Sequence, residues 1–177
     1  MKNLLLTIVL LSLCVSLQAQ ERVFPIVKNY GGIFEIPDAA EKTDPSLNYN
    51  IVIEVYSGSE KAGEINYALN NVARLINLHA VGGVPKEKIK VVVAIHGEAS
   101  YTLMQNDLYK AKYKTDNPNI ALYKALDEAG VQLFVCGQSL IARQIDSQKL
   151  LPEIKIATSM LTTVSTYQLK GYAAFKF

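Results

Sequence analysis

Short apolar runs alternate with segments of helical periodicity throughout residues 49–177, and this alternation constrains the fold more than any other feature of the chain. The runs at residues 51–55 and 89–95 are rich in Val and Ile, as is typical of strands buried on both faces of a sheet. Parallel strands need crossover connections, which are usually helices that cover both faces. The sequence therefore predicts an α/β fold, a three-layer α/β/α sandwich with a mainly parallel five-stranded sheet. The strands are expected at residues 51–55, 89–95, 131–135, 154–157 and 172–177.

The segments between these strands carry helical patterns and helix boundary signals. Asn117 followed by Pro118 is typical of a helix start, and Gly130 occupies the position of a left-handed cap. Ser159 can cap a last helix that Gly171 ends. The order of the strands in the sheet does not follow from one sequence. The helices are expected at residues 65–80, 101–111, 117–129, 139–145 and 159–169.

Residues 20–48 lack a sustained apolar period and are expected to form an extended N-terminal arm over the domain surface. The turns of the arm are expected at its glycines and prolines, which are Pro25, Gly31, Gly32, Pro37 and Pro45. The chain therefore divides into residues 1–19, this arm at 20–48 and an α/β domain at 49–177.

The first 19 residues have the three-part layout of a cleavable signal peptide. Lys2 precedes an apolar run that is too short to span a membrane, and Ala19 is a suitable last residue before cleavage. A lipid anchor on Cys14 is disfavoured because the large Leu13 precedes it. The sequence thus predicts a periplasmic or secreted protein with no membrane span after signal removal. Its mature form has one thiol, that of Cys136.

The charge pattern argues against several classes of partner and cofactor. The formal net charge is +2, and the basic residues are scattered, so no basic stripe for nucleic acid is present. Ser57-Gly58-Ser59 lacks the length and the Lys ending of a phosphate-binding loop, and no cofactor is predicted. A soft-metal site from Cys136, His96 and Met160 is a minor alternative, because it offers at most three ligands from separate loops. The ten tyrosines are spread along the chain and do not indicate a stacking platform.

Polar residues follow each of the first four predicted strands directly. The carboxyl ends of parallel strands lie along one edge of the sheet, where open α/β folds bind ligands. This rule selects the segments 57–60, 96–98, 136–139 and 158–159. Cys136 and His96 are the candidate catalytic residues at this edge. The candidate binding residues are Gly137, Gln138, Ser139, Gly97, Ser57 and Thr158.

Cys136 lies between a predicted strand and a predicted helix, and this position favours a reactive thiol. A helix N-terminus has unpaired N–H groups and a positive dipole end, both of which stabilise a thiolate. Gly137 allows a tight turn that leaves the sulfur approachable. His96 could accept the proton of Cys136, or it could be a polar residue at a strand end. The alternative for Cys136 itself is a small, packed and inert side chain.

Three segments resemble the corresponding parts of DsrE/DsrF-like proteins. They are residues 91–97, residues 130–140 and residues 169–172, and Cys136-Gly137-Gln138-Ser139 is the most specific piece. The resemblance runs from about Tyr49 to the C-terminus. It implies a three-layer sandwich on a parallel five-stranded sheet, assembly into homo-trimers or homo-hexamers, and a persulfide on the cysteine at the position of Cys136. A histidine in the segment of His96 recurs in some members.

Three hypotheses for function follow. The first is an exported sulfur-handling protein in which Cys136 accepts sulfane sulfur as a persulfide and passes it to the thiol of an unidentified partner, as a sulfurtransferase-like carrier. The second is a non-catalytic, oligomeric binding or assembly protein with an inert thiol. The third is a binder of copper or another soft metal.

Overall fold

The computed structural model describes residues 20–177, so the predictions of a signal peptide, of cleavage at Ala19 and of an unmodified Cys14 lie outside the described residues. The strands are β1 (Tyr49–Val55), β2 (Ile89–Ile95), β3 (Gln132–Cys136), β4 (Lys155–Ala157) and β5 (Ala173–Lys176). The α-helices are α2 (Tyr67–Val81), α3 (Asn106–Tyr113), α4 (Ile120–Glu128), α5 (Gly137–Ala142) and α6 (Met160–Leu169). Short 3₁₀ helices are η1 (Lys86–Lys88), η2 (Gly97–Leu103) and η3 (Ser147–Lys149). Within the described chain, no helix is long and apolar enough to cross a membrane.

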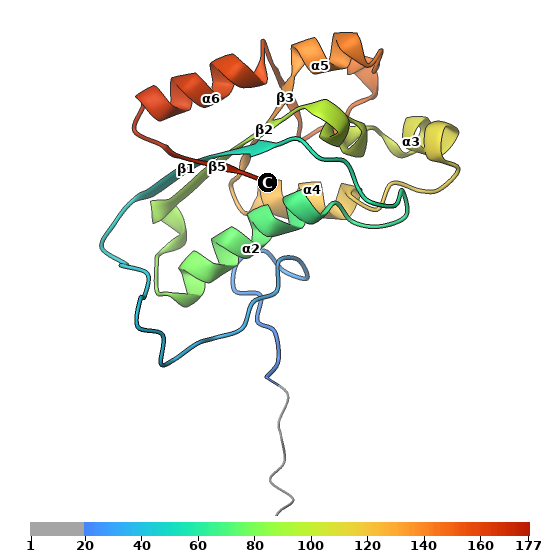
Figure 1. The fold of residues 1–177 in the computed structure, drawn as a ribbon. Helices are drawn as coiled ribbons and strands as arrows, with labels where there is room; N and C mark the ends of the chain where they lie inside the picture. Colours follow the sequence, from blue (N-terminus) through green and yellow to red (C-terminus); the bar gives the residue numbers. More distant parts are fainter. Residues whose placement is uncertain (1–19) are drawn as a thin grey trace, which may run out of the picture.

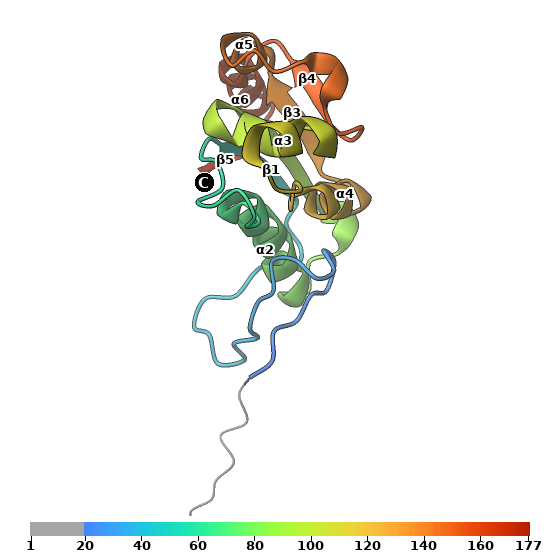
Figure 2. The same cartoon turned by 90° about the vertical axis from the view of Figure 1, so that its right-hand side faces the viewer.

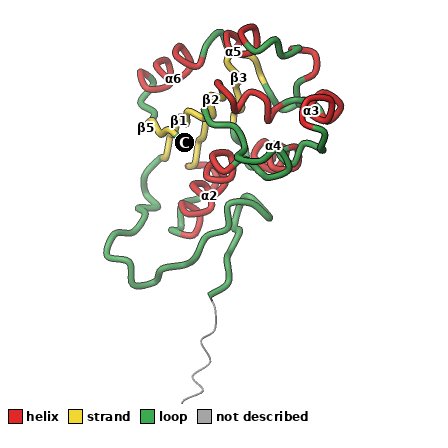
Figure 3. Tube along the Cα trace, turned by 45° about the vertical axis from the view of Figure 1, so that its right-hand side comes forward, coloured by secondary structure: helices red, strands yellow, loops and turns green. Residues whose placement is uncertain are grey.

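The five strands form one sheet in the order β4-β3-β2-β1-β5, and every strand pair is parallel. Helices α2 and α4 lie against one face, and α5 and α6 lie against the other, which gives three layers (Figures 1 and 2). The predicted α/β/α sandwich is therefore confirmed. Figure 3 shows that the helices alternate with the strands along the whole domain, as crossover connections of parallel strands require.

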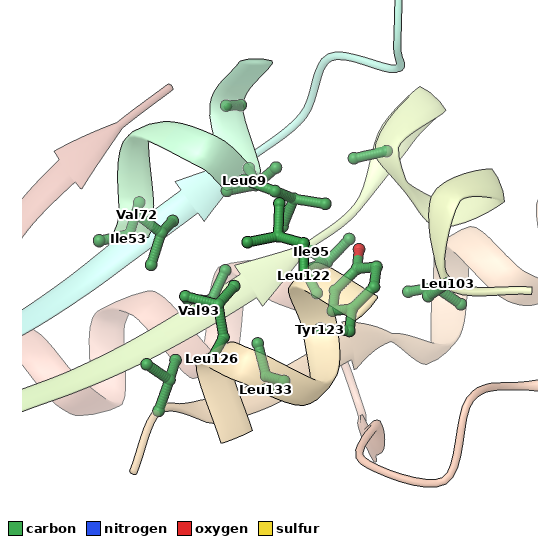
Figure 4. Packing of buried hydrophobic residues seen from close by; sticks show 14 of the residues in the cluster. Ile53, Leu69, Val72, Val93, Ile95, Leu103, Leu122, Tyr123, Leu126 and Leu133 are labelled. Carbon is green, nitrogen blue, oxygen red and sulfur yellow. The ribbon is translucent and has the colours of Figure 1, made fainter. Parts of the chain in front are cut away.

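The face under α2 and α4 holds most of the hydrophobic core. Leu69 and Val72 from α2 and Leu122 and Leu126 from α4 are fully buried. They pack on strand residues such as Val93 (Figure 4). Burial of each such side chain contributes about 1.5–3 kcal/mol of stability. This layer explains why the β-branched runs of the sequence identify the strands so well.

The arm is more deeply integrated than the expected surface segment, because its middle is part of the core. Val27 is fully buried, and Ile33 is 1% exposed. Asn77 of α2 fixes this part of the arm: its Oδ1 accepts hydrogen bonds from the backbone N–H groups of Ile26 and Val27. The Asn77 amide donates to the carbonyl oxygens of three arm residues, Val27, Tyr30 and Gly31. Only the outer parts of residues 20–48 lie over the surface as predicted.

Several helix boundaries differ from the prediction. Helix α5 runs from Gly137 to Ala142 and not over residues 139–145. Helix α4 begins at Ile120 and not at Pro118, because Asn117 is buried and braces a turn. Its amide donates to the carbonyl oxygens of Thr102 and Met104, and its Oδ1 accepts from the N–H of Asn119.

The helix expected at residues 101–111 is broken in two, into η2 and α3. Between them the backbone pairs with the segment around Leu150, through a bridge to Met104 and the bond from the N–H of Leu151 to the carbonyl of Leu103.

Candidate functional site

Cys136 is the last residue of β3, and α5 begins at the next residue. The predicted strand-to-helix position of Cys136 holds, but the strand reaches one residue further than residues 131–135 and the helix begins before residue 139. Phe134 and Cys136 are two residues apart in β3, so their side chains point to the same face of the sheet. Phe134 packs against Tyr167 of α6. The thiol therefore lies on the α5/α6 side of the sheet. Cys136 is 6% exposed. A Cβ on Gly137 would lie 3.0 Å from the carbonyl oxygen of Ala157, so the glycine permits the close approach of β3 and β4 after the thiol.

Two serine hydroxyl groups contact the thiol. The Oγ of Ser159 lies 3.9 Å from the Sγ of Cys136, and the Ser139 side chain is a second hydrogen-bond partner of the sulfur. Each hydroxyl also accepts a backbone hydrogen bond: Ser159 from the N–H of Leu161 at 3.2 Å, and Ser139 from the N–H of Gly97 at 3.3 Å. The neutral thiol donates to the hydroxyl oxygen of Ser159, and once the thiol is ionised both hydroxyls can donate their protons to the sulfur.

The surroundings of Cys136 favour the ionised thiol. Burial raises the pKa of Cys136, but hydrogen bonds from the N–H groups of Met160 and Ser139 and from the hydroxyls of Ser139 and Ser159 lower it. The donors prevail, and the pKa of Cys136 lies below its ordinary value. The Met160 and Ser139 N–H groups belong to the first turns of α6 and α5, so two helix starts converge on one sulfur atom.

His96 follows β2 at the same edge of the sheet, but its side chain is engaged elsewhere. Its Nε2 lies 2.9 Å from Oε1 of Glu54 in β1, and Lys176 of β5 lies 2.9 Å from the same oxygen. The ring also packs on Tyr56, with centroids 5.1 Å apart. Among the described residues no hydrogen bond joins His96 to Cys136. The structure thus places His96 in a hydrogen-bonded network with Glu54 of β1 and Lys176 of β5.

The other predicted binding residues divide into two groups. Gly97 has a φ of +58° beside the Tyr56 ring and donates to Ser139, so it supports the thiol site. Gln138, Ser57 and Thr158 are exposed at the same edge. For these three, the structure shows no side-chain contact with the thiol within residues 20–177.

Sequence reasoning missed two features of the site. The first is the direct role of the Ser159 hydroxyl and the Met160 N–H, although Ser159 was expected to cap the helix and does so. The second is the network around Glu54. A lone carboxylate inside a buried β-branched run needs a charged partner, and that signal is present in the sequence.

Metal ligands do not cluster in the part of the chain that the structure describes. No three His, Cys, Asp or Glu side chains of residues 20–177 lie close enough together to hold a metal ion.

The fold and the site define a parallel α/β protein with a thiol at a strand-to-helix junction. A family model described as the DsrE/DsrF-like family matches residues 49–177, and the chain belongs to that family. The family is associated with sulfur relay in general. The family resemblance noted in the sequence is therefore confirmed.

Two solved structures share the fold. A protein of unknown function from Methanobacterium thermoautotrophicum, MTH1491, is 17% identical with a TM-score of 0.55, and the match covers 73% of this chain and 99% of that chain. The ychN protein from E. coli is 14% identical with a TM-score of 0.51, again over 73% of this chain and 99% of that chain. No curated protein matches the sequence. At these identities the two structures establish the fold alone.

Proposed function

We propose that the protein is a sulfur carrier in which Cys136 accepts sulfane sulfur and passes it on. The Cys136 thiolate attacks the outer sulfur of a donor persulfide, R–S–SH. The new S–S bond forms on Cys136 as the donor S–S bond breaks and R–S⁻ leaves with the electron pair. An acceptor thiolate then attacks the outer sulfur of the Cys136 persulfide and releases the Cys136 thiolate. The two steps need no external oxidant or reductant.

The observation that carries this proposal is the set of hydrogen-bond donors around the sulfur. The N–H of Met160 and the hydroxyls of Ser139 and Ser159 favour the thiolate, which is the nucleophile of the first step. The same stabilisation makes Cys136 a better leaving group in the second step, because a thiol of lower pKa leaves faster. An inert packed cysteine has no need of these donors.

His96 has no direct part in the proposed transfer. Its imidazole is bound to Glu54, and the donors around Cys136 stabilise the thiolate without a general base. The Cys136→Ser and His96→Gln variants therefore differ in their expected effects. We expect Cys136→Ser to abolish sulfur loading and His96→Gln to leave it within about twofold of wild type.

Mass spectrometry of protein treated with polysulfide tests the proposal. The peptide that contains Cys136 is expected to gain the mass of one or more sulfur atoms, and dithiothreitol is expected to remove them. Cys136→Ser is the matched control for loading at any other site, Cys14 included. Absence of an adduct on Cys136, under conditions that load a known sulfur carrier, would contradict the proposal.

A second candidate is a non-catalytic assembly protein with an inert thiol, and the burial of Cys136 favours it. With 6% of the residue exposed, sulfur transfer needs local movement at the start of α6, where Leu161 and Thr162 are exposed. Slow alkylation of Cys136 in native protein and fast alkylation in denaturant would favour this candidate. Fast alkylation in both states would eliminate it.

We also propose that copies of the chain associate into a trimer or hexamer. Large apolar side chains are exposed on the α5/α6 side and on the edge strands, and Leu169 is 90% exposed. Their concentration on this side supports association, because large exposed apolar patches mark interaction sites. The others are Ile141, Ile156, Leu161 and Phe175. A single monomer mass by multi-angle light scattering, across the micromolar range, would contradict association.

We also propose that the protein is exported to the periplasm or the medium. It rests on the layout of residues 1–19, which places the apolar run between Lys2 and Ala19. N-terminal sequencing of protein recovered from the extracytoplasmic fraction is expected to begin near Gln20. Full-length protein confined to the cytoplasm would refute it.

A further inference from the structure

A pocket separate from the thiol site lies at the same edge of the sheet, beside β1 and β2. It has a volume of about 400 Å³. Its walls come from the loop that follows β1, from η2 and from α3. Cys136 does not line it, so the proposed sulfur chemistry does not account for it.

Three tyrosine rings form one side of this pocket. Tyr101, Tyr109 and Tyr113 all line it. The centroids of Tyr101 and Tyr113 are 6.2 Å apart with nearly perpendicular planes, and those of Tyr109 and Tyr113 are 4.6 Å apart. The sequence spreads its ten tyrosines along the chain, and the fold brings these three together. Tyr109 and Tyr113 are neighbours four residues apart on α3, and the fold adds Tyr101 from η2 to complete the aromatic wall.

This aromatic wall already binds a cation within the chain. The ammonium of Lys112 lies 4.4 Å from the centroid of Tyr101 and 5.4 Å from that of Tyr113. Both distances are within the range in which the negative face of a ring attracts a positive charge. The contact with Lys112 shows that these rings attract a positive charge.

The polar groups of the pocket carry negative or neutral charge. Glu60 and Glu98 line it, and no Lys or Arg does so among the described residues. Burial, followed by the neighbouring phenols and Glu98, raises the pKa of Tyr113 to about 12, so its ring stays neutral. The hydroxyl oxygen of Ser59 is buried at the pocket and has no hydrogen-bond partner within the described chain. Lys112 and Arg143 contact two of the rings and Glu98 but do not line the pocket. The lining itself carries two carboxylates and three rings, which favour a cation over an anion.

We propose that this pocket binds a small organic cation, of the substituted ammonium class, between the tyrosine rings and the two glutamates. Ring faces attract alkylated ammonium groups strongly because such cations lose little hydration on binding. Glu98 has an oxygen 3.3 Å from Arg143 and is 58% exposed, so it retains capacity to face a ligand. The site is independent of Cys136 and adds a binding function to the protein.

Calorimetric titration with choline tests the site, because choline has an uncharged isostere. Dimethylbutanol has the same shape with carbon in place of nitrogen. Choline is expected to bind with one site per chain, and dimethylbutanol is expected to bind at least about tenfold more weakly. Equal binding of the two compounds, or no binding of choline at millimolar concentration, would overturn the proposal.

Two variants and one matched control locate the binding. Glu98→Gln removes an exposed charge without loss of packing, and Tyr101→Leu removes a ring; each is expected to weaken choline binding about tenfold. Tyr167→Leu is the control, since Tyr167 also has a lysine ammonium over its ring, that of Lys170 at 4.9 Å, but lies outside the pocket. Choline affinity that falls equally in the control, or that survives in both pocket variants, would contradict the assignment.

Discussion

The two faces of the sheet differ in composition and in what they do. The face under α2 and α4 is covered by fully buried apolar side chains, such as Leu122 and Val93. The face under α5 and α6 includes the Glu54 network and Cys136, and α6 has one buried residue, Thr163. The residues that contribute most to stability and the residues of the candidate site therefore lie on opposite faces of the sheet. One side supplies the core, and the other presents hydrogen-bond donors and exposed apolar surface.

The largest expected effect is a core truncation on the α2/α4 side. Leu126→Ala removes a fully buried side chain and is expected to lower the free energy of unfolding by about 2–5 kcal/mol. Gln168→Ala on α6 is the control at an exposed position outside the proposed association surface, with an expected change within about 0.5 kcal/mol. Urea denaturation measures both. Similar losses in the two variants would break the distinction between the faces.

The attachment of the arm to α2 gives the next effect. Asn77→Ala removes the side chain that bonds five backbone groups of residues 26–31, and leaves buried donors and acceptors unpaired. We expect a loss of about 2–3 kcal/mol and faster proteolysis within the arm. Asn71→Ala on the same helix is the control. An arm as resistant to protease in Asn77→Ala as in wild type would show that the apolar contacts of Val27 and Ile33 suffice.

The Glu54 network predicts a pH dependence of stability on the α5/α6 side. Burial raises the pKa of Glu54, but hydrogen bonds from Lys176 and His96 lower it to a net value below its ordinary 4.5. A carboxylate whose pKa is lower in the folded state adds stability above its unfolded pKa, and loses it as the pH falls through the folded value. Glu54→Gln should therefore cost stability at neutral pH and flatten the fall below about pH 4.

The midpoints of urea unfolding of wild type and Glu54→Gln, measured from neutral pH to about pH 3, check this prediction. Glu87→Gln, an exposed carboxylate in η1, is the control and should keep the wild-type slope. Parallel curves for wild type and Glu54→Gln would mean that the network adds nothing to stability.

The smallest expected effect concerns one donor at the thiol. Ser159→Ala removes the hydroxyl 3.9 Å from the Cys136 sulfur, so the pKa of Cys136 should rise. Alkylation of Cys136 at neutral pH should slow by roughly fivefold, the order expected for one hydrogen bond to a charged group. Ser165→Ala, on the same helix but away from the thiol, should alkylate at the wild-type rate. Equal rates in all three proteins would remove Ser159 from the site.

Much of the fold follows from local patterns in the sequence. The β-branched runs locate β1 and β2, and the capping residue Ser159 locates the start of α6. The strand-to-helix position of Cys136 is equally local. These features are predictable because they depend on neighbouring residues.

The remaining features depend on residues that are distant in the chain. The partners of Asn77 lie 46 to 51 residues away, and Ser159 lies 23 residues from Cys136. The break at Met104 needs the segment near Leu150, which no helical pattern reveals. Which donors reach the thiol depends on the pairing of β3 with β4, and strand order is absent from the local pattern.

The rate of alkylation of Cys136 as a function of pH tests the central claim most directly. The reaction of native protein with iodoacetamide is followed on the Cys136 peptide by mass spectrometry, so that Cys14 does not interfere. We predict a midpoint below the one that Cys136 has in the urea-unfolded protein, because the donors around the sulfur lower its pKa in the folded state. A midpoint at or above that value, or full protection of Cys136 in the folded protein at every pH, would show that the donors at the starts of α5 and α6 do not produce a reactive thiolate.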